Sequence, residues 1–436
     1  MPYIKQFFFC AIAILALLLC TTRAHAQAEN FGSPYSRFGL GDLQPFSLAQ
    51  HRAMGGITTT FYDSASLNLG NPASLSDLKL TNIEFGTIGN IARLQSNSAS
   101  QYRSSFNLGY AMLGFPVSSR WGTAIGFQPY AFTNYNISSQ VDSSFGNWRE
   151  DYNGRGGINQ VSWSNGFALG KGFHLGLTVN YLFGTINQER LFIYPNPDSL
   201  FLFNVRVTDQ VKVNDLSFSL GMQYRKALKP KGKSGRAISV GLVAELPAAI
   251  GATNNFVAER FTYVGTAIRV RDTVANQSGI EGDINLPLAL AFGLQYSVEN
   301  KFVGALEAKY TNWSDFSQFG RPDSLQNSMQ FAAGFQYTPK YDAIGDGAFF
   351  KTIRYRAGLR YHTGMLVLRD QQVSELGMTF GVGIPTRRMM SRPYINFTAE
   401  LGQRGSLNQG LVRERYVRMT LGFTLNDRWF IKRKYD

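Results

Sequence analysis

Arginines at alternate positions form the pattern in this sequence with the clearest chemical use. Arg354, Arg356 and Arg360 are separated by even numbers of residues, and the side chains between them are apolar, aromatic or glycine. Because alternate residues of a β-strand point to the same side, a strand here would have one cationic face. Guanidinium groups bind carboxylates through paired N–H donors. The pattern therefore predicts a counter-charge for a ligand carboxylate or, as an equally good alternative, a set of structural ion pairs.

The sequence lacks the usual patterns of catalytic and metal-binding residues. After residue 26 it contains three histidines, His51, His174 and His362, and no cysteine. No H-E-x-x-H, G-x-S-x-G or Walker motif occurs in it. We therefore expect no enzyme activity, no metal site and no cofactor.

The elements that must position these side chains are β-strands, because apolar residues recur at every second position along the chain. Between Phe173 and Phe183 every odd position is apolar or aromatic, whereas histidine, glycine, threonine and asparagine occupy the even positions from 174 to 180. No apolar run is long enough for a membrane-spanning helix. About fourteen alternating segments, most of about 10 to 16 residues, begin near these residues: Thr81, Arg103, Arg120, Arg155, Phe173, Thr208, Arg236, Ile284, Lys301, Ser328, Ile353, Val373, Pro393 and Arg415.

The length and number of these segments predict an all-β fold, a 14-stranded antiparallel transmembrane β-barrel. Soluble strands usually have about five or six residues, whereas a tilted strand needs roughly 9–11 to cross a bilayer. An arginine that faces lipid near the bilayer centre costs roughly 2–4 kcal/mol. The arginine face is therefore expected in the lumen, together with Glu307 and Lys309 from another segment. A soluble β-sandwich is the alternative, but its strands would be shorter.

The composition agrees with many strands joined by turns. Of 436 residues, 44 are glycine, 14% are aromatic and only 17% are charged, whereas glycine usually makes up about 7%. The 43 Lys and Arg against 29 Asp and Glu give a net charge of +14. Because the sequence contains no nucleic-acid-binding motif, we expect this charge to face a lumen or an anionic membrane surface, and no nucleic acid as a partner.

The first 26 residues have the layout of a secretory signal peptide. Lys5 precedes an apolar run from Phe7 to Cys20, and Ala24-His25-Ala26 provides a cleavage signal before Gln27. Cleavage there would remove both cysteines, Cys10 and Cys20, so we expect an exported protein without disulfide bonds. An uncleaved membrane anchor is the alternative.

Three parts are expected: the signal peptide at 1–26, an N-terminal hatch at 27–80 and the barrel at 81–436. Residues 27–80 are rich in Gly, Ser and Pro and do not alternate. About fifty residues before the first strand suit a plug inside the lumen, and a disordered periplasmic tail is the alternative. Residues 138–154, 189–207 and 253–283 are expected to be long polar loops on the outer side, opposite short periplasmic turns.

Short motifs in the sequence resemble those of a known family. Arg-Ala-Met-Gly-Gly at 52–56, Asp-Ser-Ala at 63–65 and Asn-Pro-Ala at 71–73 are similar to the hatch of the FadL/OmpP1/TodX family. Members of that family are outer-membrane transporters of long-chain fatty acids and aromatic hydrocarbons. Residues 310–316 are similar to its W-S-x-F strand end, and residues 426–434 are similar to the end of outer-membrane proteins of the Bacteroidota.

The resemblance implies passive uptake of hydrophobic small molecules, such as long-chain fatty acids, across the outer membrane of a Gram-negative bacterium. Outer-membrane lipid and lipopolysaccharide would surround the barrel. In that family a kink in the third strand makes a lateral opening. Gly126 and Pro129, with Asn71, Pro72 and Ala73 packed beside them, would form it here, because proline cannot donate a hydrogen bond to a β-ladder. A strand that ends a few residues early is the alternative.

A second function remains open on the same motifs. The superfamily includes PorV-like barrels, which serve a protein secretion machinery and have the same Gly-Gly and Asn-Pro-Ala hatch pattern. The alternative function is therefore that of an accessory barrel in a secretion or surface-assembly complex, with the proteins of that complex as partners.

Overall fold

The computed structural model describes residues 32–143, 146–194, 203–231, 234–343, 348–386, 393–427 and 429. The expected signal peptide, residues 1–26, lies outside these ranges.

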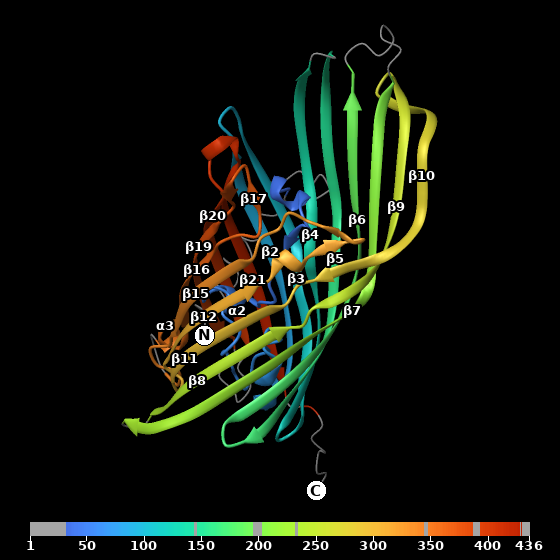
Figure 1. Cartoon of the computed structure of the whole chain (residues 1–436). Helices are drawn as coiled ribbons and strands as arrows, with labels where there is room; N and C mark the ends of the chain where they lie inside the picture. Colours follow the sequence, from blue (N-terminus) through green and yellow to red (C-terminus); the bar gives the residue numbers. More distant parts are fainter. Residues whose placement is uncertain are drawn as a thin grey trace.

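A closed antiparallel barrel makes up most of the described chain (Figure 1). Sixteen strand segments form its fourteen strands, because β8 continues into β9 and β10 into β11 past Pro247 and Pro287. Pairing between the first and last of them, β2 and β21, closes the barrel. The segments are β2 (Thr81–Gln95), β3 (Ser100–Ser118), β4 (Trp121–Ser143), β5 (Gly146–Gly170), β6 (Phe173–Ile193), β7 (Asn204–Lys231), β8 (Ser234–Glu245), β9 (Ala248–Val264), β10 (Ala267–Leu286), β11 (Ala289–Val298), β12 (Phe302–Thr311), β15 (Ser328–Tyr337), β16 (Arg354–His362), β19 (Glu375–Pro385), β20 (Tyr394–Arg404) and β21 (Arg413–Asp427).

Short elements lie before the barrel and in its connections. Residues before β2 form η1 (Pro34–Arg37), β1 (Asp42–Leu43), α2 (Ala49–Arg52) and η2 (Pro72–Asp77). The connections contain η3 (Trp313–Asp315), β13 (Ser317–Gln318), β14 (Arg321–Pro322), α3 (Ala348–Thr352), β17 (Val367–Leu368), β18 (Gln371–Gln372) and η4 (Asn408–Gly410).

The two faces of the strands differ as the alternating sequence predicts. On β11 the outward side chains Leu290, Phe292 and Leu294 are 40%, 53% and 45% exposed, whereas the inward Ala289 and Ala291 are buried. Similar outward apolar side chains continue on the other strands and form a band around the barrel. The expected fold class, an all-β barrel of 14 antiparallel strands, is therefore confirmed. Among the described residues, no helix has the length and apolar character needed to cross a membrane.

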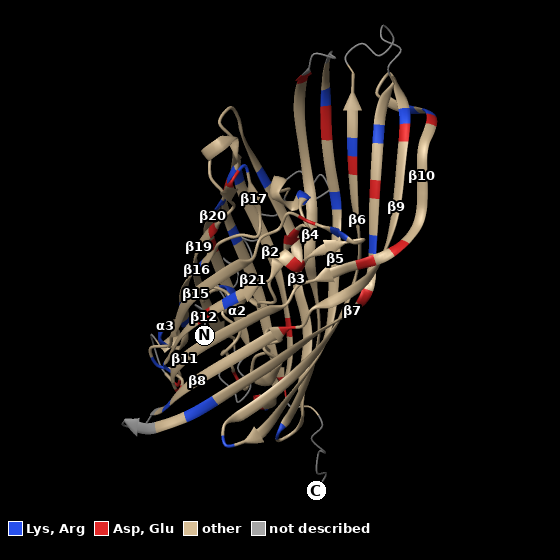
Figure 2. Ribbon diagram, in the orientation of Figure 1, with Lys and Arg blue, Asp and Glu red and all other residues tan. Residues whose placement is uncertain are grey.

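One side of the barrel rises far above the other. Strands β4 to β7 have 21 to 28 residues, whereas β11, β12, β15 and β16 have 9 or 10. We call the upper parts of β4 to β7, with β9 and β10, the tall wall (Figure 1). Charged residues are scattered over it (Figure 2).

The tall wall corrects one expectation from the sequence. Most of residues 138–154, 189–207 and 253–283, expected as loops, are strand. Polar residues occupy both faces of these segments, a pattern that is typical of loops. The segments are nevertheless strands, because they rise above the apolar band, where both faces meet water.

Residues 32–80, here called the N-terminal segment, pack against the inner face of the barrel. Inward glycines of the barrel strands approach this segment very closely. A Cβ atom added to any of them would lie 2.0–2.9 Å from an atom of the segment. A larger residue there would force the segment or its side chains to shift, which explains much of the glycine excess. We call these twelve residues the glycine girdle: Gly114, Gly122, Gly126, Gly166, Gly176, Gly221, Gly241, Gly293, Gly334, Gly358, Gly381 and Gly422.

Candidate functional site

The ladder between β3 and β4 stops part-way up the barrel. It runs from Ser118 and Trp121 to Ala111 and Phe127. Above that point, within the described chain, residues 100–110 of β3 pair only with β2, and β4 pairs with β5 and, at two positions, with β1. We call this interruption the seam. The two residues of β1 pair with Phe132 and Ala131, so the N-terminal segment occupies part of it.

Gly126 and Pro129 lie where the ladder ends. Gly126 is still paired with Met112 of β3, whereas Pro129 comes two residues after the last pair. A register shift between β4 and β5 follows Pro129 directly. Proline has no N–H to continue a ladder and is confined to bulges and edges. Pro129 therefore helps to end the β3–β4 ladder at this position.

The motif at 71–73 lies elsewhere on the wall. Its backbone and side-chain atoms pack against Gly166 of β5, Gly176 of β6 and Gly221 of β7. The Asn71 amide donates hydrogen bonds to the carbonyls of Thr59 (2.6 Å) and Met222 (3.2 Å). The structure therefore brings Gly126 and Pro129 together and places Asn71, Pro72 and Ala73 against the neighbouring strands.

Two cavities lie behind the seam and share the lining residues 42–45. The smaller, of about 110 Å³, is lined by Ile88 of β2, Leu108 of β3 and Pro129 of β4, among others. The larger, of about 260 Å³, lies deeper in the lumen and is lined by both apolar and polar side chains. Leu108 is also 48% exposed on the outer surface, so the smaller cavity lies just inside the wall.

The three predicted arginines all face the lumen, and protein groups already bind each of them. Arg354 Nη1 lies 2.9 Å from Asp63 Oδ2 of the N-terminal segment. Arg356 donates hydrogen bonds to Gln336 Oε1 (2.8 Å) and Asn396 Oδ1 (2.9 Å). The guanidinium of Arg360 is bound by two carboxylates, described next.

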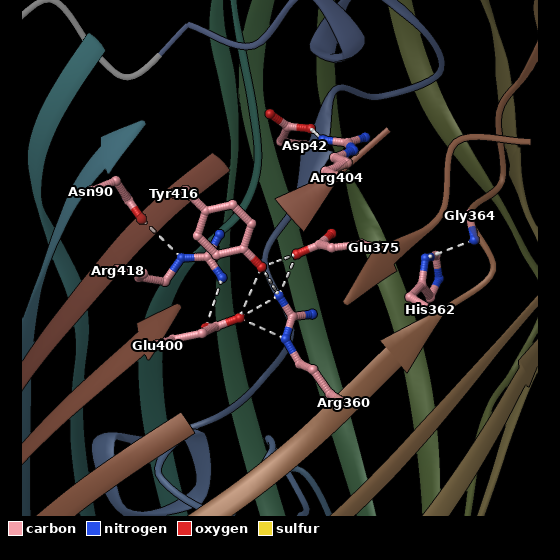
Figure 3. Close-up of polar contacts among 10 residues, drawn as sticks. All are labelled: Asp42, Asn90, Arg360, His362, Gly364, Glu375, Glu400, Arg404, Tyr416 and Arg418. Atoms are coloured by element: carbon pink, nitrogen blue, oxygen red, sulfur yellow. Dashed lines mark hydrogen bonds and ion pairs between the residues drawn. The ribbon is translucent and has the colours of Figure 1, made fainter. Parts of the chain in front are cut away.

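Arg360 is part of a network across β16, β19, β20 and β21 (Figure 3). Its Nε donates to Glu400 Oε1 at 2.7 Å, and its Nη2 contacts Glu375. Tyr416 donates to Glu375 at 2.5 Å, and Arg418 Nη1 lies 3.2 Å from Glu400 Oε2. The positive charges of Arg360 and Arg418 are thus neutralised by carboxylates of the barrel, which leaves no free counter-charge at this point.

Sequence reasoning missed Glu375, Tyr416 and the ion pair of Arg404 with Asp42. The sequence did contain a signal for these residues. Arg404 and Glu400 are an even number of positions apart on β20, and so are Tyr416 and Arg418 on β21. Equal parity places side chains on one face, but which of them meet across strands depends on the register.

Glu307 and Lys309 have separate partners. The Glu307 carboxylate accepts hydrogen bonds from the backbone N–H groups of Thr58 (2.9 Å) and Thr59 (2.8 Å), and so holds the N-terminal segment to β12. Lys309 Nζ lies 2.6 Å from Glu245 Oε1 and lines the larger cavity.

His51 lies in the buried part of the N-terminal segment. Desolvation, with a smaller contribution from the nearby Arg356 charge, lowers its pKa to about 3. The backbone N–H of Leu48 points to its Nδ1 at 3.4 Å, and its ring meets Phe61 edge-on. It is therefore a neutral packing residue.

A serine–histidine contact does not have the arrangement of a catalytic pair. Ser76 Oγ lies 2.7 Å from His174 Nδ1, but it also donates its hydrogen to the Ala73 carbonyl at 2.7 Å. A hydroxyl has one hydrogen to donate, so the imidazole is the donor here and anchors η2 to β6. In the part of the chain that the structure describes, no group of three or more His, Cys, Asp or Glu is placed to hold a metal ion.

The family model BamG matches residues 4–436, almost the entire sequence. The chain belongs to the BamG family. No curated protein matches it.

Solved structures similar to this BamG-family chain have the same fold. A Pseudomonas aeruginosa FadL homologue is 12% identical with a TM-score of 0.61, over 89% of this chain and 100% of that one. The Ralstonia pickettii toluene transporter TbuX is 15% identical with a TM-score of 0.58, over 92% and 100%. The P. putida toluene transporter TodX is 15% identical with a TM-score of 0.57, over 89% and 100%. The expected likeness to FadL-type transporters is confirmed for the fold.

Proposed function

We propose that this chain is an outer-membrane channel through which small hydrophobic molecules pass from the lumen, through the seam, into the membrane. The observation that carries the proposal is the end of the β3–β4 ladder at Ala111 and Phe127, with a cavity directly behind it. Solved structures of the same fold include proteins described as toluene transporters, which supports the same class of cargo here.

The physics of the bilayer supports a sideways path. Unpaired strand edges at membrane depth are tolerated where they line a cavity, and residues of the free β3 edge, Ser105 and Asn107 among them, line the smaller cavity. For an apolar molecule that reaches this cavity, transfer into lipid is more favourable than transfer into periplasmic water. We place the gate at Pro129, with β1 as the element that must move.

The proposal includes the division of the chain into a signal peptide at 1–26, a hatch at 27–80 and a barrel at 81–436. The close approach of the glycine girdle to residues 49–75 supports a plug that leaves no path straight through to the periplasm. The hatch would then direct molecules sideways.

Small molecules fit the lumen better than long-chain fatty acids do. The larger cavity, of about 260 Å³, is at the small end of the range of ligand pockets, roughly 300–1,000 Å³. Arg360 is already paired with barrel carboxylates, so a fatty-acid carboxylate would find no free partner there.

Locking the seam tests the proposal. Leu108→Cys on β3 and Phe132→Cys on β4 place thiols on two residues that line the smaller cavity, and a cleavable bismaleimide can join them. We expect uptake of a radiolabelled monoaromatic compound by cells to fall at least about fivefold and to recover when the linker is cleaved.

The matched control is Leu177→Cys with Leu220→Cys, an outward pair directly opposed on β6 and β7. Joining this pair should leave uptake unchanged. Equal uptake with the seam locked and unlocked would refute lateral exit.

One observation favours a second function, that of an accessory barrel in a surface-assembly or secretion complex. On β7, residues 204–215 continue above the outward apolar residues Leu216 and Phe218. At roughly 3.3 Å per residue, these twelve residues span about 40 Å. Along β10, nearly every side chain from 267 to 283 is exposed, with Val270 and Val274 among them. A wall this tall exceeds the needs of a small channel and offers a surface for other proteins.

Crosslinking in intact cells separates the two functions. A photoreactive residue at Val274 would form specific adducts with other outer-membrane proteins if the tall wall is a docking surface. The same residue at Leu242, on the outward face of β8, provides the comparison. Adducts at neither position, or equal adducts at both, would exclude the wall as a specific docking surface.

A further inference from the structure

We infer that the larger lumenal cavity is a binding site for a small neutral amphiphile, a molecule that combines an apolar group with one or two hydroxyl or amide groups. The inference deepens the proposed channel function and rests on it. Its evidence is the arrangement of polar and apolar side chains around the cavity.

A row of polar residues runs round one side of the cavity. Lys309, Gln330, His362, Glu375 and Arg404 lie on β12, β15, β16, β19 and β20, and each is directly opposite the next in the sheet. All five line the cavity. We call this row the polar collar.

The charges around the collar are already satisfied within the protein. Lys309 is paired with Glu245 at 2.6 Å, and Arg404 with Asp42 at 2.5 Å. The carboxylate of Glu375 contacts Arg360. An ionic ligand would have to break one of these pairs and leave its partner uncompensated, so the cavity favours a neutral ligand.

Three neutral polar side chains at the cavity differ from these charged residues, because polar atoms of theirs are left without a partner. Gln128 is only 4% exposed, lines both cavities, and has no hydrogen-bond partner for its amide in the described part of the chain. The same holds for Gln330 and for Nε2 of His362, whose Nδ1 accepts from the Gly364 N–H at 3.1 Å. Three side chains thus offer free donors and acceptors to a molecule in the cavity.

These free groups make a purely apolar ligand unfavourable. Such a ligand would displace water from Gln128 and Gln330 and leave them unpaired. A site built to hydrogen-bond a hydroxyl strongly rejects the analogue that lacks it. A ligand with a hydroxyl or amide group would instead replace the displaced hydrogen bonds.

Apolar side chains also line the cavity. Phe46 and Leu69 of the N-terminal segment, Leu286 of β10, Trp313 of η3 and Met365 line it. This surface accepts the apolar part of the same molecule. The free amides of Gln128 and Gln330 and an apolar lining around one small space together specify an amphiphile.

A pair of fluorinated probes tests the inference. The full-length barrel in lipid nanodiscs would be titrated with 4-fluorobenzyl alcohol and 4-fluorotoluene, which differ by a single hydroxyl, and binding followed by fluorine NMR. Protein-free nanodiscs measure partition into lipid. We expect the alcohol to bind at least about tenfold more tightly than fluorotoluene.

Variants locate the site. Gln128→Leu should weaken binding of the alcohol about tenfold and leave fluorotoluene binding unchanged or stronger, and Gln330→Leu should act in the same direction. Gln188→Leu, the same change on β6 away from both cavities, should bind like the wild type. Equal or tighter binding of fluorotoluene by the wild-type barrel would overturn the inference, as would unchanged alcohol binding in both cavity variants.

The result can be separated from that of the proposed channel. The crosslink between the thiols introduced by Leu108→Cys and Phe132→Cys changes escape through the seam and leaves the collar untouched. Normal uptake through a locked seam, together with selective binding of the alcohol, would refute lateral exit and retain the site. Blocked uptake together with no preference for the alcohol would refute the site and retain the exit.

Discussion

Arg404 of β20 and Asp42 of β1 form an ion pair inside the lumen, with 2.5 Å between Arg404 Nη1 and Asp42 Oδ1. The side chains of both residues are more than four-fifths buried. Because β1 is the element that occupies the seam, this pair connects β20 to the residues that close the lateral opening of the barrel (Figure 3).

Asp42→Asn should loosen the closure of the seam. Breaking a buried ion pair from one side costs roughly 3–5 kcal/mol, and the cost falls on the short contact between β1 and β4. We expect hydrogen exchange in residues 38–46 to rise at least tenfold and uptake of a monoaromatic compound to increase severalfold.

Glu259→Gln is the matched control, because it breaks an ion pair of the same length with Arg206 on the tall wall. It should leave exchange in residues 38–46 unchanged. If Asp42→Asn also leaves that exchange unchanged, the ion pair does not hold β1 in the seam.

The glycine girdle gives a second prediction. In Gly176→Ala, the added Cβ would lie 2.4 Å from backbone atoms of Pro72 and Ala73. Overpacking of this kind costs about 1–3 kcal/mol, so protease accessibility of residues 71–77 should rise while the barrel remains folded in a heat-modifiability gel.

Gly89→Ala provides the comparison. A Cβ at Gly89 would have its nearest neighbour at 3.7 Å, on Phe106, which is an ordinary contact. This variant should behave like the wild type, and equal protection of residues 71–77 in both variants would show that the girdle does not fix the N-terminal segment.

Much of the barrel could be predicted from residue alternation. The starts expected at Thr81, Phe173 and Ser328 coincide with the starts of β2, β6 and β15. Alternation works in this band because one face meets apolar surroundings and the other the lumen, so a shift by one residue would reverse every side chain. Above the band both faces are wet and the sequence signal disappears, which is why the upper parts of β9 and β10 were expected to be a loop.

The candidate site was less predictable. Alternation placed Arg356 and Arg360 in the lumen, because neither is tolerated on the outer face. Their partners depend on the strand register and on the course of the N-terminal segment, so the contact of Arg360 with Glu375 and that of Arg404 with Asp42 could not be read from the sequence. Pro129 was visible in advance because proline alone lacks the N–H that a ladder needs.

Arg360→Gln tests whether this arginine serves a ligand or the barrel. Its guanidinium binds Glu375 and Glu400, so its loss would leave Glu375 with only the Tyr416 hydroxyl and Glu400 with Arg418 as the one remaining cation of the network. We expect the free energy of unfolding to fall by roughly 3–5 kcal/mol, measured by urea titration in detergent. Adding Glu375→Gln should recover part of this loss.

Fatty-acid uptake by the same variant tests the alternative, that Arg360 binds a ligand. Corrected for the amount of folded protein, decanoate uptake should be the same as in the wild type. A selective loss of decanoate uptake at unchanged stability would show that Arg360 is the counter-charge for a ligand carboxylate.

The pH dependence of the N-terminal segment follows from His51. Burial lowers its pKa to about 3 in the folded segment, whereas an exposed histidine titrates near 6.5. The released segment therefore binds a proton that the packed segment cannot, and stability is lost as the pH falls from about 6.5 towards 3. Between pH 6.5 and 5 the loss of stability should approach about 2 kcal/mol.

Hydrogen exchange in residues 47–56 tests this prediction. Corrected for its intrinsic pH dependence, it should rise over this interval in the wild type and much less in His51→Gln, which cannot titrate. The same rise in both proteins would assign the pH dependence to groups other than His51.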